Sequence, residues 1–444
     1  MKDLTKGSLI NHLTKLALPS IGGMLAFTLF NITDTYFVGK LGTESLAAMG
    51  FTFPVVMIAG AISSGISNGS ASVLARAAGE KNINKIRRTA TDGILLSLLL
   101  VVLFSSIGLL TMDSLFSFLG AKNDTLPLIK SYMSIWYSCV LVVLMPPTCD
   151  SAMRAVGDTV RPFKVMLTCA LLNIILDPIM IFGLLGFPAM GIRGAAIATI
   201  ISRFFGMLLT LYYTHFHHKL ITFNIPSFKD VFHSWETILH IGVPSAGVSL
   251  LPQIIRMSLT SLAAYTGGTI AVAAIAAGSR IEGFTLTIAM AIGISIIPII
   301  GQNFGAKKYS RVNQFRQILN KASLFIGLGM FITMIFVATP IIKLFTSDIA
   351  VINLTKDYLL LLTFSSIGLN LYNFTSQELN GIGLSKKAFK MNALGTLFII
   401  LPLLFIGSRF SFVYMIMGLS LGQLLLGIIS VFYGKKYLFL NKTP

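Results

Sequence analysis

Long apolar stretches separated by short polar segments run from one end of the chain to the other. A helix needs about 20 predominantly apolar residues to cross a bilayer, and runs of that length recur along the whole sequence. The pattern therefore predicts twelve membrane-spanning helices. They are expected near residues 13–38, 46–67, 92–115, 130–150, 163–184, 193–214, 238–263, 270–300, 322–343, 353–376, 390–408 and 412–434.

The composition supports a membrane protein built only from helices. Of the 444 residues, 55% are hydrophobic and 11% are charged, and the mean hydropathy is +0.82. A soluble domain is usually about a quarter charged. We therefore expect an all-α polytopic membrane protein embedded in a lipid bilayer.

The net charge of +18 raises the question of nucleic-acid binding. With twelve helices, roughly two thirds of the Lys and Arg residues fall on the side of the membrane that holds both termini, as the positive-inside rule describes. The basic excess thus predicts cytoplasmic termini and no nucleic-acid partner. The cluster His215, His217 and His218 is interpreted as a solvated, basic helix end rather than a metal site.

The sequence repeats itself after about half its length. LALPSIGG at 16–23 returns as IGVPSAGV at 241–248, an offset of 225 residues, and Gly79 returns as Gly305 within GQNFGAKK at 301–308, an offset of 226 residues. MRAVGDTVR at 153–161 returns as LNGIGLSKK at 379–387, an offset of 226 residues. Duplication of an even number of helices gives two halves of the same membrane orientation. We expect an N-lobe at 1–215, a cytoplasmic linker at 216–237 and a C-lobe at 238–444, which together favour a transporter over a channel or scaffold.

Two intramembrane acids break this repeat. Asp34 corresponds to Thr260 in the second half, and Asp177-Pro178 corresponds to Leu401-Pro402. A carboxylate is costly in a membrane helix and usually marks a functional site. Because the duplicated architecture does not require these acids, we interpret them as functional.

Other polar residues are expected at the same depth as the two acids. Asp34 and Asp177 lie near the outer ends of the first and fifth helices, and Asn173 is one turn from Asp177. Thr199 and Tyr132 lie near the outer starts of the sixth and fourth helices. Two close carboxylates can hold a proton between them, whereas a set of oxygen ligands can bind Na⁺. A polar cluster that only joins the helices is the alternative.

A second set of candidates could contact a substrate in a central cavity. Arg256 and Glu282 lie deep in the second half, where an intramembrane ion pair is the alternative to a substrate contact. Met57 and Met166 are candidates for lining the cavity, although Met is also a common apolar filler.

Together, these motifs resemble the multidrug and toxic compound extrusion (MATE) family, over essentially the whole chain. The shared features are the Pro-Ser pairs that open the first and seventh helices, GQNFGAKK and RAVGDT. The chain is most similar to the prokaryotic branch with coupling aspartates in the N-lobe. The resemblance implies two six-helix bundles of the MATE fold in the MOP superfamily, and a monomer in the prokaryotic cytoplasmic (inner) membrane. It also implies efflux of organic, often cationic, compounds in exchange for H⁺ or Na⁺, with no cofactor.

The resemblance also assigns roles to individual residues. Those implied for ion coupling are Asp34, Asp177, Asn173, Thr199 and Tyr132, with Na⁺ held by the first four if Na⁺ is the ion. Pro19 matches the family's helix-1 proline, which implies a hinge. Another branch carries an acid in the seventh helix, but SLLPQIIR at 249–256 contains none.

Two alternatives belong to other functional classes. A flippase for lipids or lipid-linked oligosaccharides occurs in the same superfamily, but it is typically associated with fourteen helices and a strongly basic cavity. An intramembrane aspartyl protease would need only two close acids, yet it would not require duplicated halves. We therefore expect a transporter rather than an enzyme.

Overall fold

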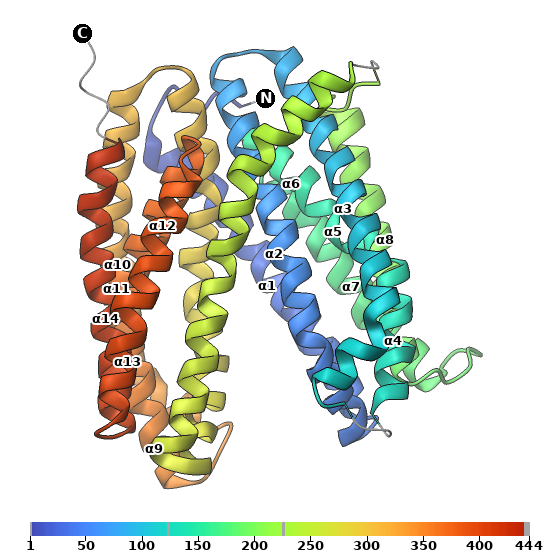
Figure 1. The fold of residues 1–444 in the computed structure, drawn as a ribbon, viewed down its shortest axis with the longest axis vertical. Coiled ribbons are helices and arrows are strands. Elements are labelled where there is room, and N and C mark those ends of the chain that lie inside the picture. The colour runs from blue at the N-terminus through green and yellow to red at the C-terminus, as the bar shows by residue number, and fades with distance from the viewer. Residues whose placement is uncertain (1, 122–124, 224–226, 439–444) are drawn as a thin grey trace. The chain divides into compact units, whose positions relative to one another are not determined.

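The computed structural model describes residues 2–121, 125–223 and 227–438, and within them it contains helices and no strand (Figure 1). The helices are α1 (Leu9–Gly39), α2 (Thr43–Gly79), α3 (Ile83–Phe118), α4 (Leu126–Ser138), α5 (Leu141–Leu144), α6 (Pro146–Ala155), α7 (Val160–Phe182), α8 (Ile192–Tyr212), α9 (Phe228–Gly305), α10 (Tyr309–Ile342), α11 (Ile349–Gly381), α12 (Ser385–Gly395), α13 (Leu401–Ser408) and α14 (Phe412–Leu438). Two π-helical turns, η1 (Tyr213–His217) and η2 (Thr396–Ile400), continue α8 and join α12 to α13.

The helices of the described residues provide the expected number of membrane spans. Ten helices are long and apolar enough to cross a membrane, and a bent pair, Leu126–Ser138 with Leu141–Ala155, adds one more. One of these, α9, has 78 residues, which would make a straight helix about 120 Å long. It is broken at Gly268, where φ is 59° and ψ is −146°, and each of its two arms is long enough for one span. The prediction of twelve membrane-spanning helices is therefore confirmed.

Several helices extend beyond the apolar runs that predict them. The helix expected from residue 92 begins at Ile83, after Asn82 accepts a hydrogen bond from the Lys85 backbone amide. The helix expected from residue 238 begins at Phe228, inside the expected linker. Apolar counting finds only the part of a helix that contacts hydrocarbon, so polar turns at its ends are missed. Residues 224–226 of the linker, including Pro226, lie outside the described residues.

The fourth span is not the single helix that was expected over 130–150. α4 ends at Ser138, and α5 and α6 complete the span after a bend of 64°. Pro146 and Pro147 lie at the start of α6, beyond the bend, where their missing amides leave the Val142 and Val143 carbonyls without helical partners and separate α5 from α6.

The duplicated sequence produces duplicated backbone geometry. Lys81 and Lys307, which follow α2 and α9, both have φ of 58°. Gly157 and Gly383 have φ of 86° and 87°, in the left-handed region that favours glycine. Each pair is separated by the repeat interval, so the duplication determines loop conformation as well as helix number.

A close helix contact is duplicated too. Gly22 of α1 packs on Phe163 of α7, and Gly247 of α9 packs on Phe389 of α12. A Cβ atom at these glycines would come within 2.8 Å and 2.6 Å of the respective rings, so a larger residue would separate the helices.

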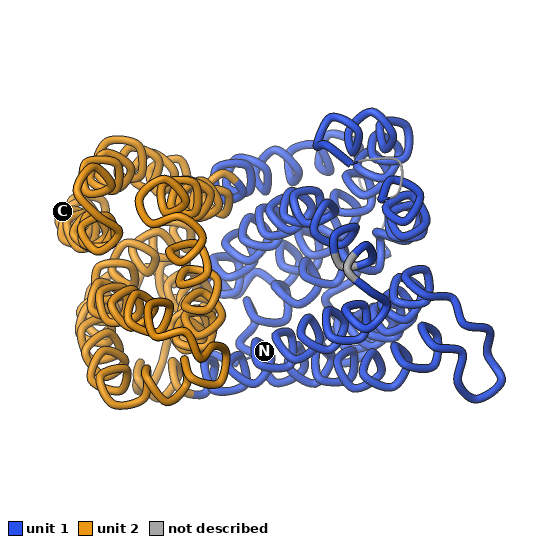
Figure 2. The backbone as a smooth tube through the Cα atoms, turned by 90° about the horizontal axis from the view of Figure 1, so that it is seen from below, with its two compact units in different colours: residues 1–3, 15–246 blue, residues 4–14, 247–444 orange. Residues whose placement is uncertain are grey.

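The residues form two compact units, shown in different colours in Figure 2. Unit 1 comprises residues 1–3 and 15–246, and unit 2 comprises residues 4–14 and 247–444. The N-terminal segment packs within unit 2, where Gln302 Oε1 accepts from the Leu4 amide at 2.9 Å and Lys308 Nζ donates to the Thr5 carbonyl at 2.8 Å. The lobe and linker boundaries expected from the sequence stay a prediction.

Candidate functional site

The two acids that break the repeat are buried in unit 1 near the ends of two helices. Asp34 in α1 is 7% exposed, and Asp177 in α7 is completely buried. Each lies five residues before its helix ends, at Gly39 and Phe182 respectively, which corresponds to about 8 Å along the axis. The two carboxylates interact electrostatically with each other, so the helices bring them to one site.

Asn173 orients the Asp177 carboxylate. The two residues are one helical turn apart, and Asn173 Nδ2 donates a 2.9 Å hydrogen bond to Asp177 Oδ1. Pro178 follows in the same helix and has no amide hydrogen, so the Ile174 carbonyl one turn earlier lacks its usual helical partner. α7 therefore supplies a fixed carboxylate together with an amide oxygen and a backbone oxygen.

Tyr132 and Thr199 come from helices that start at the same end of unit 1. Tyr132 is about 9 Å along α4 from Leu126, and Thr199 is about 10 Å along α8 from Ile192. Both side chains are buried, at 6% and 7% exposure. The site residues of α1, α4, α7 and α8 therefore lie at about the same axial distance from the helix ends, to within a few ångströms.

A hydrophobic cluster joins these helices around Tyr132. The Tyr132 side chain belongs to one packed cluster with Val38, Ile181 and Ala195. Each of these three apolar residues is one helical turn from a polar site residue on α1, α7 or α8. The Tyr132 phenol also lies within electrostatic range of both carboxylates.

Four buried oxygen atoms of the site have no hydrogen-bond partner among the residues that the structure describes. They are Asp34 Oδ1, Asn173 Oδ1, Asp177 Oδ2 and Thr199 Oγ1. Burying a polar atom without a partner is costly, and in native proteins such an atom usually meets an ordered water, an ion or a catalytic partner. This donor set fits a bound proton or a small hard cation, because both are stabilised by convergent oxygen atoms.

A half-buried arginine that the motifs did not single out lies next to this site. Arg203 is one turn after Thr199 in α8, and its guanidinium lies 4.6 Å from the ring of Phe30, one turn before Asp34. Arg203 Nη1 also lies 3.7 Å from Met166 Sδ. Arg203 therefore contacts both α1 and α7, and Met166 packs inside unit 1 beside them.

Arg203 is part of a larger group of charges. Asp150 accepts a 3.4 Å hydrogen bond from Thr210 Oγ1 and interacts electrostatically with Arg154 and Arg203. In the sequence, this group is indicated only by Asp150 and Arg154, whose spacing of four residues places them on one helix face. The contact with Arg203 was not detectable, because it joins helices that are far apart in the sequence.

Two residues of the second candidate set, Arg256 and Glu282, form an ion pair in unit 2. Arg256 Nη2 lies 4.0 Å from Glu282 Oε2, and the same oxygen accepts a 2.8 Å hydrogen bond from the Tyr358 hydroxyl. Arg280 makes no ion pair within the described part of the chain. Sequence reasoning missed Tyr358 because its partner Glu282 lies 76 residues away in the chain.

The remaining candidates have simpler surroundings. Met57 is half-buried in α2. Pro19 lies inside the continuous helix α1, where its missing amide leaves the Lys15 carbonyl without a helical partner. The residues of α1 before Lys15 belong to unit 2, and those from Lys15 onward belong to unit 1. Lys15 is one turn before Pro19, so the helical turn weakened by Pro19 begins at the boundary between the two units.

Comparison with known proteins gives the same result over the whole chain. The MatE family model matches residues 19–179 and 244–406, two segments that begin at the equivalent prolines of the repeat. The FAD transporter of Shewanella oneidensis is 32% identical over 420 residues, covering 94% of this chain and 92% of that protein. The probable multidrug resistance protein NorM of Thermotoga maritima is 28% identical over 355 residues, covering 78% and 74%.

A solved structure has the same fold. A crystal structure of a mutant of the Vibrio cholerae MATE transporter VcmN superposes with a TM-score of 0.92 at 29% identity, and 97% of each chain is covered. The family match spans well over half of the chain, which excludes the protease alternative. The chain therefore belongs to the MATE family, and it is a membrane transporter of the MOP-superfamily fold rather than an enzyme.

Proposed function

We propose that this transporter is a secondary antiporter that exports organic compounds in exchange for H⁺ or Na⁺, with the Asp34–Asp177 cluster as its ion-coupling site. The observation that supports this proposal most directly is the set of four buried oxygen atoms that find no partner among the described residues. Its bacterial relatives support a place in a prokaryotic cytoplasmic membrane, and the charge bias of its loops supports cytoplasmic positions for both termini. It acts as a monomer.

With H⁺ as the coupling ion, the carboxylates share the proton. The Asn173 amide donates to Asp177 Oδ1, which favours charge on that oxygen and leaves Oδ2 as the side that can take a proton. Two adjacent carboxylates in a buried site repel each other when both are ionised, so the pair takes up a proton readily. Proton uptake at Asp34 or Asp177 thus changes the net charge of the site by one.

With Na⁺ as the coupling ion, the same oxygen atoms supply its ligands. Asp34, Asn173, Asp177 and Thr199 would hold the ion through the oxygens that have no other partner. Bound Na⁺ would neutralise one of the two negative charges. In either case, the residues of the chain perform the same task, since they hold a positive charge between α1, α7 and α8.

Ion binding must alter substrate affinity to drive export. An antiporter requires an ion that binds one conformation better than the other. We place the link in α1, because this helix carries both Asp34 and Phe30, the ring over which Arg203 lies. The turn weakened by Pro19 lets α1 adjust when the charge near Asp34 changes.

The substrate class has two candidates. Organic cations are the substrates that the resemblance to multidrug transporters implies. Export of flavin adenine dinucleotide is the second, and it is favoured by the relative named as a FAD transporter, which shares 32% identity, against 28% for NorM. The two classes carry opposite charge, so a single flux experiment separates them.

The test is flux in proteoliposomes under separately imposed gradients. Purified protein is reconstituted with entrapped ethidium or FAD, and release is followed under a pH gradient or a Na⁺ gradient. We expect one gradient to accelerate the release of one substrate, and the Asp34→Asn variant to lose that acceleration. Net substrate release from the wild-type protein that neither gradient accelerates would refute antiport, and translocation of a labelled lipid instead of either solute would favour the flippase alternative.

A further inference from the structure

A hollow of about 570 Å³ lies in unit 1 at the end of the bundle that carries the basic loops. It is bordered by the start of α3, the start of α7 and the segment that follows η1. Four side chains with permanent positive charge line it: Lys2, Arg87, Arg161 and Lys219. They come from four separate segments of the chain, and the positive-inside rule does not require them to converge.

The floor of the hollow is apolar. Ile86, Val156 and Leu220 line it, are at most 5% exposed, and belong to one hydrophobic cluster. Val160 also lines the hollow and is 39% exposed. The hollow therefore combines cationic side chains with a surface suited to the non-polar part of a ligand.

One carboxylate lines the hollow, and it is already engaged. Asp158 Oδ2 accepts a 2.9 Å hydrogen bond from His218 Nε2 and pairs with the Arg161 guanidinium. Burial alone would raise the pKa of Asp158, but the hydrogen bonds from His218 and Arg161 lower it well below its usual range. Asp158 stays ionised and balances Arg161, which leaves the charges of Lys2 and Lys219 without an acid among the lining residues.

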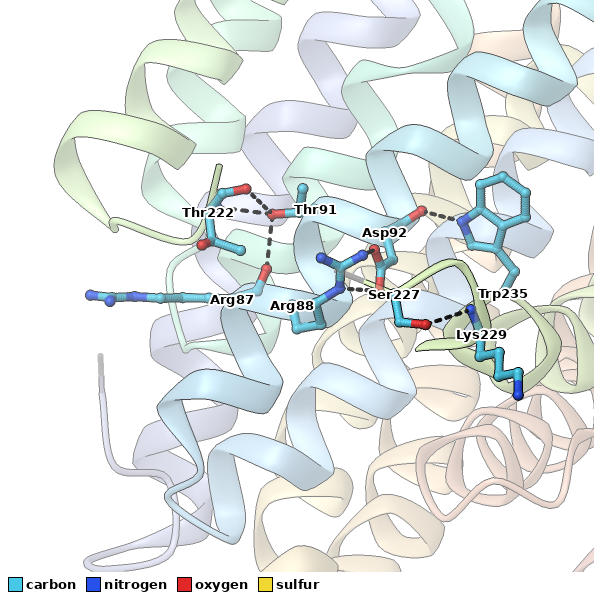
Figure 3. Close-up of polar contacts among 8 residues, drawn as sticks. All are labelled: Arg87, Arg88, Thr91, Asp92, Thr222, Ser227, Lys229 and Trp235. Atoms are coloured by element: carbon cyan, nitrogen blue, oxygen red, sulfur yellow. Dashed lines mark hydrogen bonds and ion pairs between the residues drawn. The ribbon is translucent and has the colours of Figure 1, made fainter. Parts of the chain in front are cut away.

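The segment that closes the hollow is docked on α3. The Thr222 amide donates a 3.0 Å hydrogen bond to Thr91 Oγ1 (Figure 3). Further along, Trp235 Nε1 donates to the Asp92 carbonyl at 2.9 Å. The Arg87 side chain extends away from these contacts (Figure 3).

Backbone contacts fix the cationic residues themselves. Arg87 Nε donates a 3.0 Å hydrogen bond to the Lys219 carbonyl, and the Lys2 amide donates to the Val156 carbonyl at 2.9 Å. Three of the four cationic residues are therefore held in place before any ligand arrives, which lowers the entropy cost of binding.

From this arrangement, we propose that the hollow binds the phosphate group of an anionic ester, with its non-polar portion on the Ile86–Val156–Leu220 floor. Arginine and lysine side chains are the usual partners of phosphate oxygens. Like charges gathered at one place repel each other, and a phosphate between them removes that repulsion. The ester can be the headgroup of a membrane phospholipid or a soluble nucleotide, since both present the same phosphate chemistry.

Binding is tested on the full-length protein in nanodiscs of phosphatidylcholine. In one arm, part of the lipid is replaced by phosphatidylglycerol, and in the other, ADP is titrated. Native mass spectrometry counts retained anions, and the midpoint of thermal unfolding gives the affinity. The variant is Lys219→Asn, and the matched control is Lys81→Asn. Both lysines are exposed loop residues with positive φ, 52° and 58°, which asparagine tolerates, but Lys81 does not line the hollow.

We expect one of the two anions to bind and to raise the unfolding midpoint of the wild-type protein. Lys219→Asn should weaken that binding about fivefold, the usual effect of one basic residue on an anionic partner, and Lys81→Asn should leave it within about twofold. Stabilisation by phosphatidylglycerol alone identifies a lipid site, and stabilisation by ADP alone identifies a nucleotide site. The proposal is wrong if neither anion binds, or if both variants weaken binding equally. Neither failure affects the ion-coupling proposal, whose flux test uses other residues.

Discussion

Replacing Gly194 with alanine should push apart two helices of the proposed ion-coupling site. Gly194 is in the first turn of α8, and a Cβ atom added there would lie 2.3 Å from the Met180 carbonyl oxygen and 2.8 Å from the Ile181 amide nitrogen. Ordinary van der Waals contact begins at 3.4 Å, so α8 must move by about 1 Å. Both opposing groups belong to the backbone of α7 and cannot rotate aside.

The expected cost follows from this displacement. Overpacking of this kind costs about 1–3 kcal/mol, and the better helix propensity of alanine recovers about 1 kcal/mol. Thr199 follows in the same helix, and a shift of about 1 Å at a catalytic group can slow a reaction about 100-fold. We therefore expect ion-driven flux to fall at least tenfold, with a smaller fall in the midpoint of thermal unfolding.

The assay compares Gly194→Ala with Gly60→Ala in proteoliposome flux and thermal unfolding. Gly60 is a glycine of α2 in the same unit, and an added Cβ there meets nothing within 4 Å. Gly60→Ala should transport like the wild-type protein. Wild-type flux in Gly194→Ala would refute the claim that close packing of α8 on α7 positions the site.

Two further predictions concern contacts outside the coupling site. Tyr358→Phe removes the 2.8 Å hydrogen bond to Glu282 and should lower stability by about 1–3 kcal/mol while flux stays near normal; lost flux at an unchanged unfolding midpoint would instead indicate a substrate contact. The pKa of Asp158 is lowered in the folded state by His218 and Arg161, against the effect of burial, so this residue adds stability above about pH 4 that is lost as the pH falls further. In Asp158→Asn, the midpoint of thermal unfolding should therefore fall less steeply than in the wild-type protein as the pH is lowered below about 4. An equally steep fall in the variant would contradict this.

The sequence was sufficient for the fold because a membrane imposes strong constraints on it. Every span needs a long apolar run, so the helices could be counted directly, and the gap between the expected helices at 238–263 and 270–300 corresponds to the break at Gly268. Helix ends were less predictable. The polar first turns of α3 lie beyond the apolar run, and the bend between α4 and α6 was overlooked although Pro146 and Pro147 follow it closely.

The candidate site was predictable where a residue is costly in its own helix. Asp34 and Asp177 are conspicuous because a carboxylate in an apolar span requires an explanation, and helix direction then gave their common depth. The contacts of Arg203 and Tyr358 were not identified, because their partners, Phe30 and Glu282, lie in other helices. Such contacts arise from tertiary packing and have no local pattern.

The central claim is that Asp34 couples ion movement to export, and one comparison tests it most directly. In proteoliposomes, the Asp34→Asn variant is assayed for exchange of labelled against unlabelled substrate without a gradient, and for substrate accumulation driven by an imposed ion gradient. We predict that the variant folds, exchanges substrate and fails to accumulate it. Accumulation at the wild-type level in Asp34→Asn would contradict the claim that this carboxylate is part of the ion switch.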